Sequence, residues 1–280
     1  MLRIEVATSG AELSSIYHKN HKQEYLWQGS PDWWPRRSPV LFPIVGKLNG
    51  NLYRMNGKIF SLPQHGFARD MEFKVGRRGT NTVEFVLEST EELLQKYPFP
   101  FELKIIYSLN GVQLYIHYEV KNEGLKHMYF SIGGHPGFAL IPGETPADYY
   151  IEFEKAETLD RHLLQEGLFS GKSERVISNE KILGLNNDFF TKDALVFKNM
   201  KSSSLHMKSR KSDYAVKLTF AEFPYFGIWS KPGAAFLCLE PWCGLSDTQG
   251  FEGEFSAKEG IQSLEPGKTF LRSFSIEIES

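Results

Sequence analysis

A pair of alternating segments joined by Asn-Gly is the feature that most constrains this chain. Residues 101–109 and residues 112–120 each alternate apolar positions with polar or exposed ones. Asn110-Gly111 lies between them, and Asn-Gly is the dipeptide that best accepts the positive φ angles of a two-residue hairpin turn. The sequence therefore predicts an antiparallel hairpin over residues 101–120. A second pair, Asn56-Gly57, joins 52–55 to 58–62 and predicts another.

The rest of the chain also favours strands over helices. Aromatic residues make up 14% of the sequence, a composition that suits pleated, half-buried surfaces. One short helix is expected at residues 90–96, because Ser89-x-x-Glu92 resembles a capping box and Pro98 ends the segment. Further strands are predicted at 82–87, 149–153, 214–220, 226–229, 234–239 and 270–278, with one more at the N-terminus.

These elements predict an all-β protein, a large sandwich with few short helices. We expect the polar segments 165–178 and 198–212 to be surface loops or edge hairpins. Neither an internal repeat nor a low-complexity linker interrupts the chain, so residues 1–280 are expected to form a single domain.

Composition excludes several classes of partner. The net charge of -2 and the pI near 6.5 leave no basic footprint for nucleic acid. No apolar run approaches the roughly 18 residues of a membrane span, and the N-terminus does not read as a signal peptide. A cytoplasmic protein is therefore expected, either a monomer or a homodimer.

Two cysteines, Cys238 and Cys243, are the only ones in the sequence. No CxxC pair or Cys/His ladder accompanies them, which argues against a structural zinc site. Free thiols are the expected state, with a disulfide across the intervening turn as the alternative.

Glu240 is a carboxylate next to an apolar segment. Residues 234–239 have the length and apolarity of a buried strand, and Pro241-Trp242 are expected to form a tight turn after it. Burying a carboxylate there is costly unless a function requires it.

Two histidines lie in unusual local sequences. His65 in PQHGFAR is expected on a bend, because a proline precedes it and a glycine follows. His135 in GGHPGF is surrounded by residues with little bulk, so that a ligand can approach the imidazole closely. Histidine suits proton transfer near neutral pH. The alternative is a structural bend or bulge in which the histidine has no role.

The other histidines are expected to be solvated: His18, His21, His117, His127, His162 and His206.

An aromatic and basic segment, residues 33–43, precedes these motifs and contains Trp33, Trp34, Arg36 and Arg37. Aromatic rings can stack on the C–H faces of sugars; the alternative is a proline-rich loop held by buried tryptophans. The VGKLNG segment that follows lacks the spacing of a phosphate-binding loop.

The succession of RRSPVLFPIVGKL, LPQHGFAR, FSIGGHPGF, FGIWS and CLEPWCGLSD resembles the aldose 1-epimerase (galactose mutarotase) family, and its LacX-type branch in particular. The resemblance covers residues 6–278. It implies a β-sandwich of the galactose mutarotase-like type, a small-molecule sugar as substrate, and neither a cofactor nor a metal. The reaction that it implies interconverts the α and β anomers of a free aldose by ring opening and reclosure.

The resemblance also implies roles for particular residues. Glu240 matches the general base, His135 the acid, and His65 the second histidine, which polarises the ring oxygen or holds the sugar. The residues expected to bind the sugar are Lys47, Asp193, Arg69 and Trp229, with Asp188 and Asp247 as alternatives to Asp193. Lys47 stands where many family members have arginine, and it lacks the planar fork of a guanidinium. We expect Glu240 ionised and His135 protonated in the productive complex, with the two separated by the width of a sugar ring.

Three other functions remain open at this point. A sugar phosphate could be the substrate if Arg36, Arg37 and Arg69 formed a cationic cluster at the cleft. The same fold could serve as a carbohydrate-binding protein without catalysis. A glycosidase is disfavoured, because no second carboxylate has a setting like that of Glu240.

Overall fold

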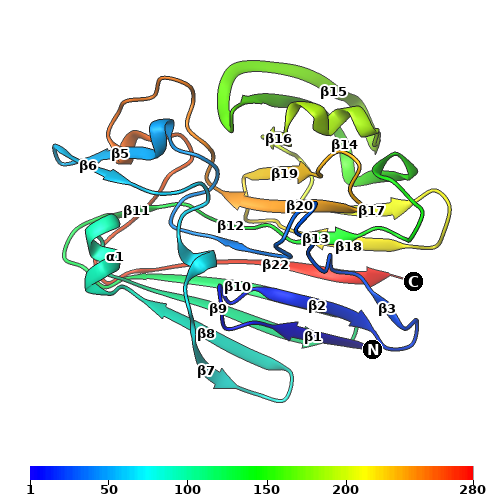
Figure 1. The fold of residues 1–280 in the computed structure, drawn as a ribbon, viewed down its shortest axis with the longest axis horizontal. Helices are drawn as coiled ribbons and strands as arrows, with labels where there is room; N and C mark the ends of the chain where they lie inside the picture. Colours follow the sequence, from blue (N-terminus) through cyan, green and yellow to red (C-terminus); the bar gives the residue numbers. More distant parts are fainter. Residues whose placement is uncertain (280) are drawn as a thin grey trace.

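The computed structural model describes residues 1–279, and it is built mainly of antiparallel strands (Figure 1). The largest sheet follows the order β4-β12-β20-β19-β16-β14-β17-β18-β22-β10-β9-β8-β7, with β13 added to β20 and β15 to β14. The all-β fold expected from the sequence is confirmed. None of the helices in this part of the chain has the length and apolarity to span a bilayer.

The strands at the β4 end of this sheet come from distant parts of the chain. Their bounds are β4 (Val40–Leu41), β12 (Ile132–Gly134), β13 (Gly137–Ala139), β20 (Phe236–Cys243), β19 (Tyr225–Trp229), β16 (Leu195–Lys198), β14 (Tyr149–Gln165) and β15 (Leu168–Gly184). The path continues through β17 (Ser204–Ser209), β18 (Ala215–Thr219), β22 (Thr269–Glu279), β10 (Gln113–Asn122), β9 (Phe101–Asn110), β8 (Thr82–Glu88) and β7 (Lys74–Arg78).

Three small sheets and six short helices complete the structure. The sheets contain β1 (Leu2–Val6), β2 (Leu13–His18) and β3 (Gln23–Glu24); β5 (Leu52–Met55) and β6 (Lys58–Ser61); and β11 (Met128–Phe130) and β21 (Gln262–Leu264). The helices are α1 (Glu91–Lys96) and the 3-10 helices η1 (Asn49–Asn51), η2 (Ala68–Asp70), η3 (Pro146–Asp148), η4 (Asn187–Lys192) and η5 (Phe255–Ala257).

Both predicted hairpins are present, but only one has the expected turn. At β5–β6 both Asn56 and Gly57 have positive φ, 52° and 74°. At β9–β10, Asn110 pairs with Gln113, so the two turn residues are Gly111 and Val112. Of these only Gly111 has positive φ, at 64°. Glycine at the first of the two turn positions permits a type II′ turn. The turn therefore lies one residue further along the chain than predicted.

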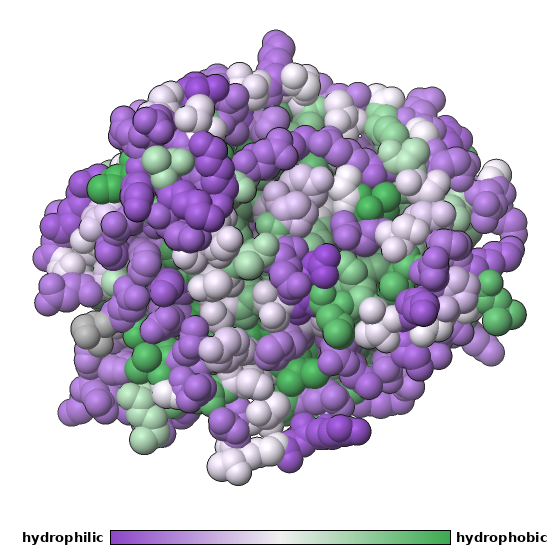
Figure 2. Space-filling model, turned by 180° about the vertical axis from the view of Figure 1, so that it is seen from behind, coloured by the Kyte–Doolittle hydropathy of each residue, from purple (hydrophilic) through white to green (hydrophobic). Residues whose placement is uncertain are grey.

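The hydrophobic alternation places one face of this hairpin in the core. Leu103, Ile105, Ile116 and Val120 are buried and belong to the main hydrophobic cluster, which Phe274 and Ile276 of β22 join. Hydrophilic residues cover most of the face seen in Figure 2, with hydrophobic residues in small separate groups. The period of two along each strand therefore separates core from solvent, as expected.

Several predicted boundaries are wrong. The strand expected at 149–153 extends to Gln165 and forms a long hairpin with β15. This hairpin includes the segment 165–178 and confirms that segment as an edge hairpin. Segment 198–212 is not at an edge, because β17 pairs with both β14 and β18. The helix is capped by Thr90 and not by Ser89, since Thr90 accepts a hydrogen bond from the amide of Leu93.

The immediate surroundings of Glu240 also differ from the expectation. Pro241 and Trp242 continue strand β20, and Pro241 pairs with Phe226 of β19, so no tight turn follows Glu240. Cys238 and Cys243 are both free and buried on this strand. His18 is buried in β2 and accepts a hydrogen bond from the amide of His21, whereas a solvated side chain was expected.

Candidate active site

Glu240 lies where strand β20 changes its neighbour. The first half of β20 pairs with β13, through Gly137 opposite Cys238, and the second half pairs with β12, through Gly133 opposite Trp242. The link between β12 and β13 is His135-Pro136, which therefore passes beside Glu240. This break in the pairing brings together two residues that are far apart in the sequence.

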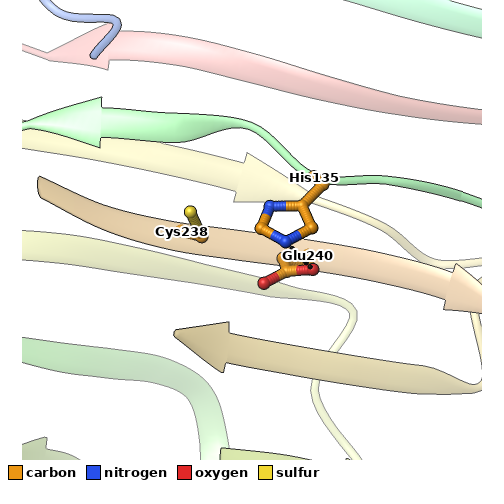
Figure 3. A group of neighbouring side chains, drawn as sticks. All are labelled: His135, Cys238 and Glu240. Carbon is orange, nitrogen blue, oxygen red and sulfur yellow. Dashed lines mark ion pairs between the residues drawn. The ribbon is translucent and has the colours of Figure 1, made fainter. Parts of the chain in front are cut away.

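The two side chains meet at close range. Nε2 of His135 lies 3.2 Å from Oε2 of Glu240. Figure 3 marks this contact with a dashed line. The exposed fractions of these side chains are only 10% and 2%. Oε2 of Glu240 has no properly oriented hydrogen-bond partner among residues 1–279. The pair is closer than the width of a sugar ring, which corrects the separation expected from the sequence.

A cavity of about 270 Å³ opens over this pair. Its size is near the lower end of the range of small-molecule sites, roughly 300–1,000 Å³, and suits a single sugar ring. The lining residues come from many segments of the chain: Trp34, Pro39, Gly46, Gln64, His65, Arg69, His135, Leu164, Gly167, Asp193, Ala194, Trp229, Glu240, Trp242 and Ser246.

His65 is held at the cavity by the backbone of Gly46. The amide of His65 donates to the carbonyl of Gly46, and the amide of Gly46 donates to Nδ1 of His65 at 3.1 Å. Because Nδ1 accepts, the neutral ring carries its proton on Nε2. His65 has a positive φ of 65°, consistent with the expected bend. Its ring lies edge-on to that of His135, with centroids 5.7 Å apart.

Burial works against charge on all three titratable groups. It raises the pKa of Glu240 well above its usual value, and the charge of Asp193 raises it further. It lowers the pKa of His135 to about 3, assisted by the positive charges of Arg69 and Arg36. The pKa of His65 is likewise well below its usual value, through burial and then through His135 and the two arginines. The free site thus favours a neutral Glu240–His135 pair, whereas an ionised pair is expected for the productive complex.

Aromatic rings surround His135 on two sides. Trp34 stacks on the imidazole at a centroid distance of 4.9 Å, and Trp229 lies edge-on at 5.7 Å. A Cβ atom at Gly137 would lie 2.7 Å from Trp34, so glycine is required for this packing. Segment 33–43 thus contributes an aromatic wall to the site through Trp34.

Arg69 of η2 and Asp193, which follows η4, also line the cavity. Nη2 of Arg69 donates to the carbonyl of Gln64. Its buried Nε lies 3.8 Å from Oδ2 of Asp70 and has no hydrogen-bond partner among the described residues. Asp193 follows η4 with φ of 74° and ψ of -163°, a conformation that residues other than glycine rarely adopt. Its side chain caps the amide of Ala194 and is otherwise exposed to the cavity.

The alternatives to Asp193 lie elsewhere. Asp247 is buried in an ion pair with Lys258, 2.7 Å away, at a neighbouring cavity of about 210 Å³. Asp188 lies on η4 and does not line the site. Lys47 does not line it either, because its Nζ donates to the carbonyl of Glu166 in the β14–β15 turn. Six of the seven residues expected at the site therefore meet in one cavity.

The sequence analysis assigned no role at the site to Gln64, Trp242 and Ser246, which also line the cavity. Trp242 shares one face of β20 with Cys238 and Glu240, as the two-residue period requires. Its ring lies over Gly227 of β19, where an added Cβ would be 2.7 Å from the indole. Its position two residues after Glu240 was the signal that could have identified it.

Comparisons with known proteins identify the family to which this fold and cavity belong. A family model described as aldose 1-epimerase matches residues 1–262. The chromosomal LacX protein of Lactococcus lactis subsp. lactis is 33% identical over 289 residues, covering 99% of this chain and 96% of that protein.

Two solved structures are similar over nearly their whole length. A galactose mutarotase related enzyme from Lactobacillus acidophilus has a TM-score of 0.95 at 32% identity, covering 100% of this chain and 95% of that one. A galactose mutarotase-like protein from Lactobacillus casei ATCC 334 has a TM-score of 0.94 at 30% identity, covering 99% and 97%. The chain belongs to the aldose 1-epimerase family, in its LacX-type branch, and has the galactose mutarotase-like fold.

Proposed function

We propose that this protein is an aldose 1-epimerase that interconverts the α and β anomers of a free aldose. The observation that carries the proposal is the contact of 3.2 Å between Oε2 of Glu240 and Nε2 of His135 at the cavity. A buried carboxyl group and a buried imidazole at this distance form a proton-transfer pair, and membership of the family supports the same chemistry.

The chemistry of a cyclic sugar requires acid and base to lie close together. The hydroxyl oxygen that loses a proton and the ring oxygen that gains one are both bonded to C1. In this proposal Glu240 removes the proton from the C1 hydroxyl while His135 protonates the ring oxygen. The bond between C1 and the ring oxygen breaks, the open-chain aldehyde rotates about C1–C2, and reclosure with the roles reversed gives the other anomer.

The starting protonation state is compatible with these roles. A neutral Glu240–His135 pair and a carboxylate–imidazolium pair contain the same number of protons. Transfer of one proton from Glu240 to Nε2 of His135 interconverts them without exchange with solvent. A bound sugar that donates its C1 hydroxyl to Glu240 favours the ionised pair, since a hydrogen bond to a carboxylate is stronger than one to a neutral acid.

The other lining groups bind and orient the sugar. His65 offers an Nε2–H to the ring oxygen, because its Nδ1 accepts a hydrogen bond from the amide of Gly46. Asp193 and Arg69 offer an acceptor and a donor for hydroxyl groups, and Trp229 offers an apolar face. Lys47 acts from outside the cavity by holding the turn after β14, which contributes Gly167 to the wall.

A free sugar is favoured over a sugar phosphate. Of Arg36, Arg37 and Arg69, only Arg69 lines the cavity, and Arg36 pairs with Asp70 at 2.6 Å. A binding protein without catalysis is also disfavoured. Recognition alone gains nothing from a nearly inaccessible carboxyl group, whose burial has a cost.

Polarimetry tests the proposal. The rotation of freshly dissolved α-D-galactose and α-D-glucose should reach equilibrium faster with the protein, and Glu240→Gln should lose about 10²- to 10⁴-fold of the rate. Glu157→Gln is the matched control, because Glu157 is equally buried but binds the amides of Lys201 and Ser202 outside the cavity. Full activity in Glu240→Gln would remove Glu240 from the mechanism.

A further inference from the structure

Cys238 is a buried group that the proposed reaction does not use, and it lies beside the two groups that the reaction does use. It shares one face of β20 with Glu240, two residues further along the strand, and the ring of His135 lies next to both side chains (Figure 3). Sγ of Cys238, a ring nitrogen of His135 and a carboxyl oxygen of Glu240 all lie within 4.8 Å of one another. All three residues are buried.

The spacing of these atoms is close to that of ligands on one metal ion. Zinc binds sulfur at about 2.3 Å and nitrogen or oxygen at about 2.0–2.2 Å, so two of its ligands lie roughly 3.2–3.7 Å apart. The separation of 3.2 Å between His135 and Glu240 already fits this range. Sγ of Cys238 lies within 4.8 Å of the other two ligand atoms and must come closer to them to complete the set.

The donor types select the metal. Magnesium and calcium prefer sets of oxygen ligands, whereas a thiolate with an imidazole favours zinc and its spectroscopic substitute cobalt. A thiolate, a carboxylate and a neutral imidazole balance the charge of a divalent ion, which lowers the cost of burying it. Glu240 lines the cavity, and its buried Oε2 has no hydrogen-bond partner among residues 1–279, so this oxygen is available as a ligand.

We propose that Cys238, His135 and Glu240 form a three-ligand zinc site whose fourth position faces the sugar cavity. Zinc displaces the thiol proton and any carboxyl proton to the buffer, and it occupies the two atoms that would otherwise move protons on the sugar. Bound zinc therefore inhibits the reaction and is not required for it. The inhibition rests on the proposed function; the binding does not.

Metal binding is measured without any sugar. Protein freed of metal with EDTA and exchanged into clean buffer is titrated with Co²⁺ and followed by absorption. The expected result is a near-ultraviolet thiolate-to-cobalt charge-transfer band with four-coordinate visible bands, which Zn²⁺ then abolishes. Equilibrium dialysis with Zn²⁺ should give one ion per chain.

Two variants locate the thiolate. Cys238→Ser should lose the charge-transfer band and bind zinc at least about 10- to 100-fold more weakly, because the loss of a mere outer-shell partner already costs that much. Cys243→Ser is the matched control, because Cys243 is also buried on β20. It is an odd number of positions away from Cys238, so it lies on the opposite face of the strand. Its Sγ donates to the carbonyl of Glu222. This variant should bind both metals like the wild type. Circular dichroism checks that each variant is folded.

Activity then tests inhibition. Micromolar Zn²⁺ should abolish mutarotation in the wild type and in Cys243→Ser, while Cys238→Ser stays active. Absence of the cobalt band in the wild type, or equal zinc affinity in the two cysteine variants, would overturn the site. Zinc binding without loss of activity would overturn the inhibition. A metal-free protein that binds zinc as expected but never accelerates mutarotation would contradict the proposed function and leave the site intact.

Discussion

The indole ring of Trp34 stacks on the imidazole of His135, with centroids 4.9 Å apart and planes inclined by 29°. The two residues come from segments a hundred residues apart, and Trp34 also packs edge-on against Trp229. The stack both excludes water from His135 and fixes the plane of its ring. The aromatic wall therefore orients the proposed acid, and it contributes to the burial that lowers the pKa of His135.

Replacing Trp34 tests this orientation. Trp34→Ala should lower kcat about tenfold, because an aromatic pair contributes about 0.5–1.5 kcal/mol beyond its buried area and that energy holds the imidazole in place. Trp34→Phe keeps a stacking ring and should retain most of the activity. Initial rates of mutarotation, measured as a function of sugar concentration, separate kcat from KM. Equal kcat values for the wild type and Trp34→Ala would contradict the role.

Gly227 provides the space for Trp242. An added Cβ would lie 2.7 Å from the indole, so Gly227→Ala should displace Trp242 and destabilise the protein by about 1–3 kcal/mol. Activity should fall as well, since Trp242 and Glu240 lie side by side on β20. Gly79→Ala is the control, because a Cβ there meets nothing closer than 3.8 Å. Urea unfolding with parallel activity measurements would detect both effects. Identical behaviour of the two variants would contradict this packing.

Asp193 and Asp247 should respond differently to the same change. Asp193→Asn keeps a residue that tolerates positive φ but removes a charged acceptor, so KM should rise about tenfold while stability changes by less than about 0.5 kcal/mol. Asp247→Asn leaves Lys258 buried without its ion-pair partner, which should cost about 3–5 kcal/mol of stability. Its KM should stay near that of the wild type. The reverse pattern would favour Asp247 as the sugar ligand.

His65 should make the protein less stable in mild acid. Its pKa in the folded protein is well below its usual value, whereas in the unfolded chain it is near 6.5. Below pH 6.5 the unfolded chain therefore binds a proton that the folded protein does not, and stability falls as the pH falls.

His65→Asn tests this contribution, because asparagine keeps an acceptor near the position of Nδ1 and tolerates the positive φ. Its free energy of unfolding should fall less steeply, by up to about 1.4 kcal/mol per pH unit. Urea unfolding at pH 7 and pH 5.5, with EDTA present, measures the two slopes, and parallel slopes would exclude this contribution.

Local signals predicted much of the fold. The hairpin of β9 and β10 was expected because its alternation and turn lie within twenty consecutive residues. The long hairpin of β14 and β15 was missed beyond residue 153, because register shifts near Glu157 and His162 interrupt its alternation. The position of β17 inside the sheet depends on pairing with β14 and β18, which no local pattern encodes.

The site was harder to predict than the fold. His135 and Glu240 were each noticed for their local surroundings, but their contact depends on the change of partner along β20, which spacing in the sequence does not reveal. Their local settings suggested proton-transfer chemistry, and the family resemblance assigned Glu240 as the base and His135 as the acid. The direction of Lys47 could not be predicted, because it depends on a carbonyl group in the turn after β14. The roles of these residues stay predictions.

Anomer exchange at equilibrium tests the central claim most directly. Saturation transfer between the α and β anomeric proton resonances of equilibrated galactose reports the exchange rate without a net reaction. The account predicts faster exchange with the wild type and a loss of about 10²-fold or more in Glu240→Gln and in His135→Gln. Because the two groups act as one unit, the double variant should be no slower than the slower single variant. Exchange at the uncatalysed rate with the wild type, or undiminished exchange with Glu240→Gln, would contradict it.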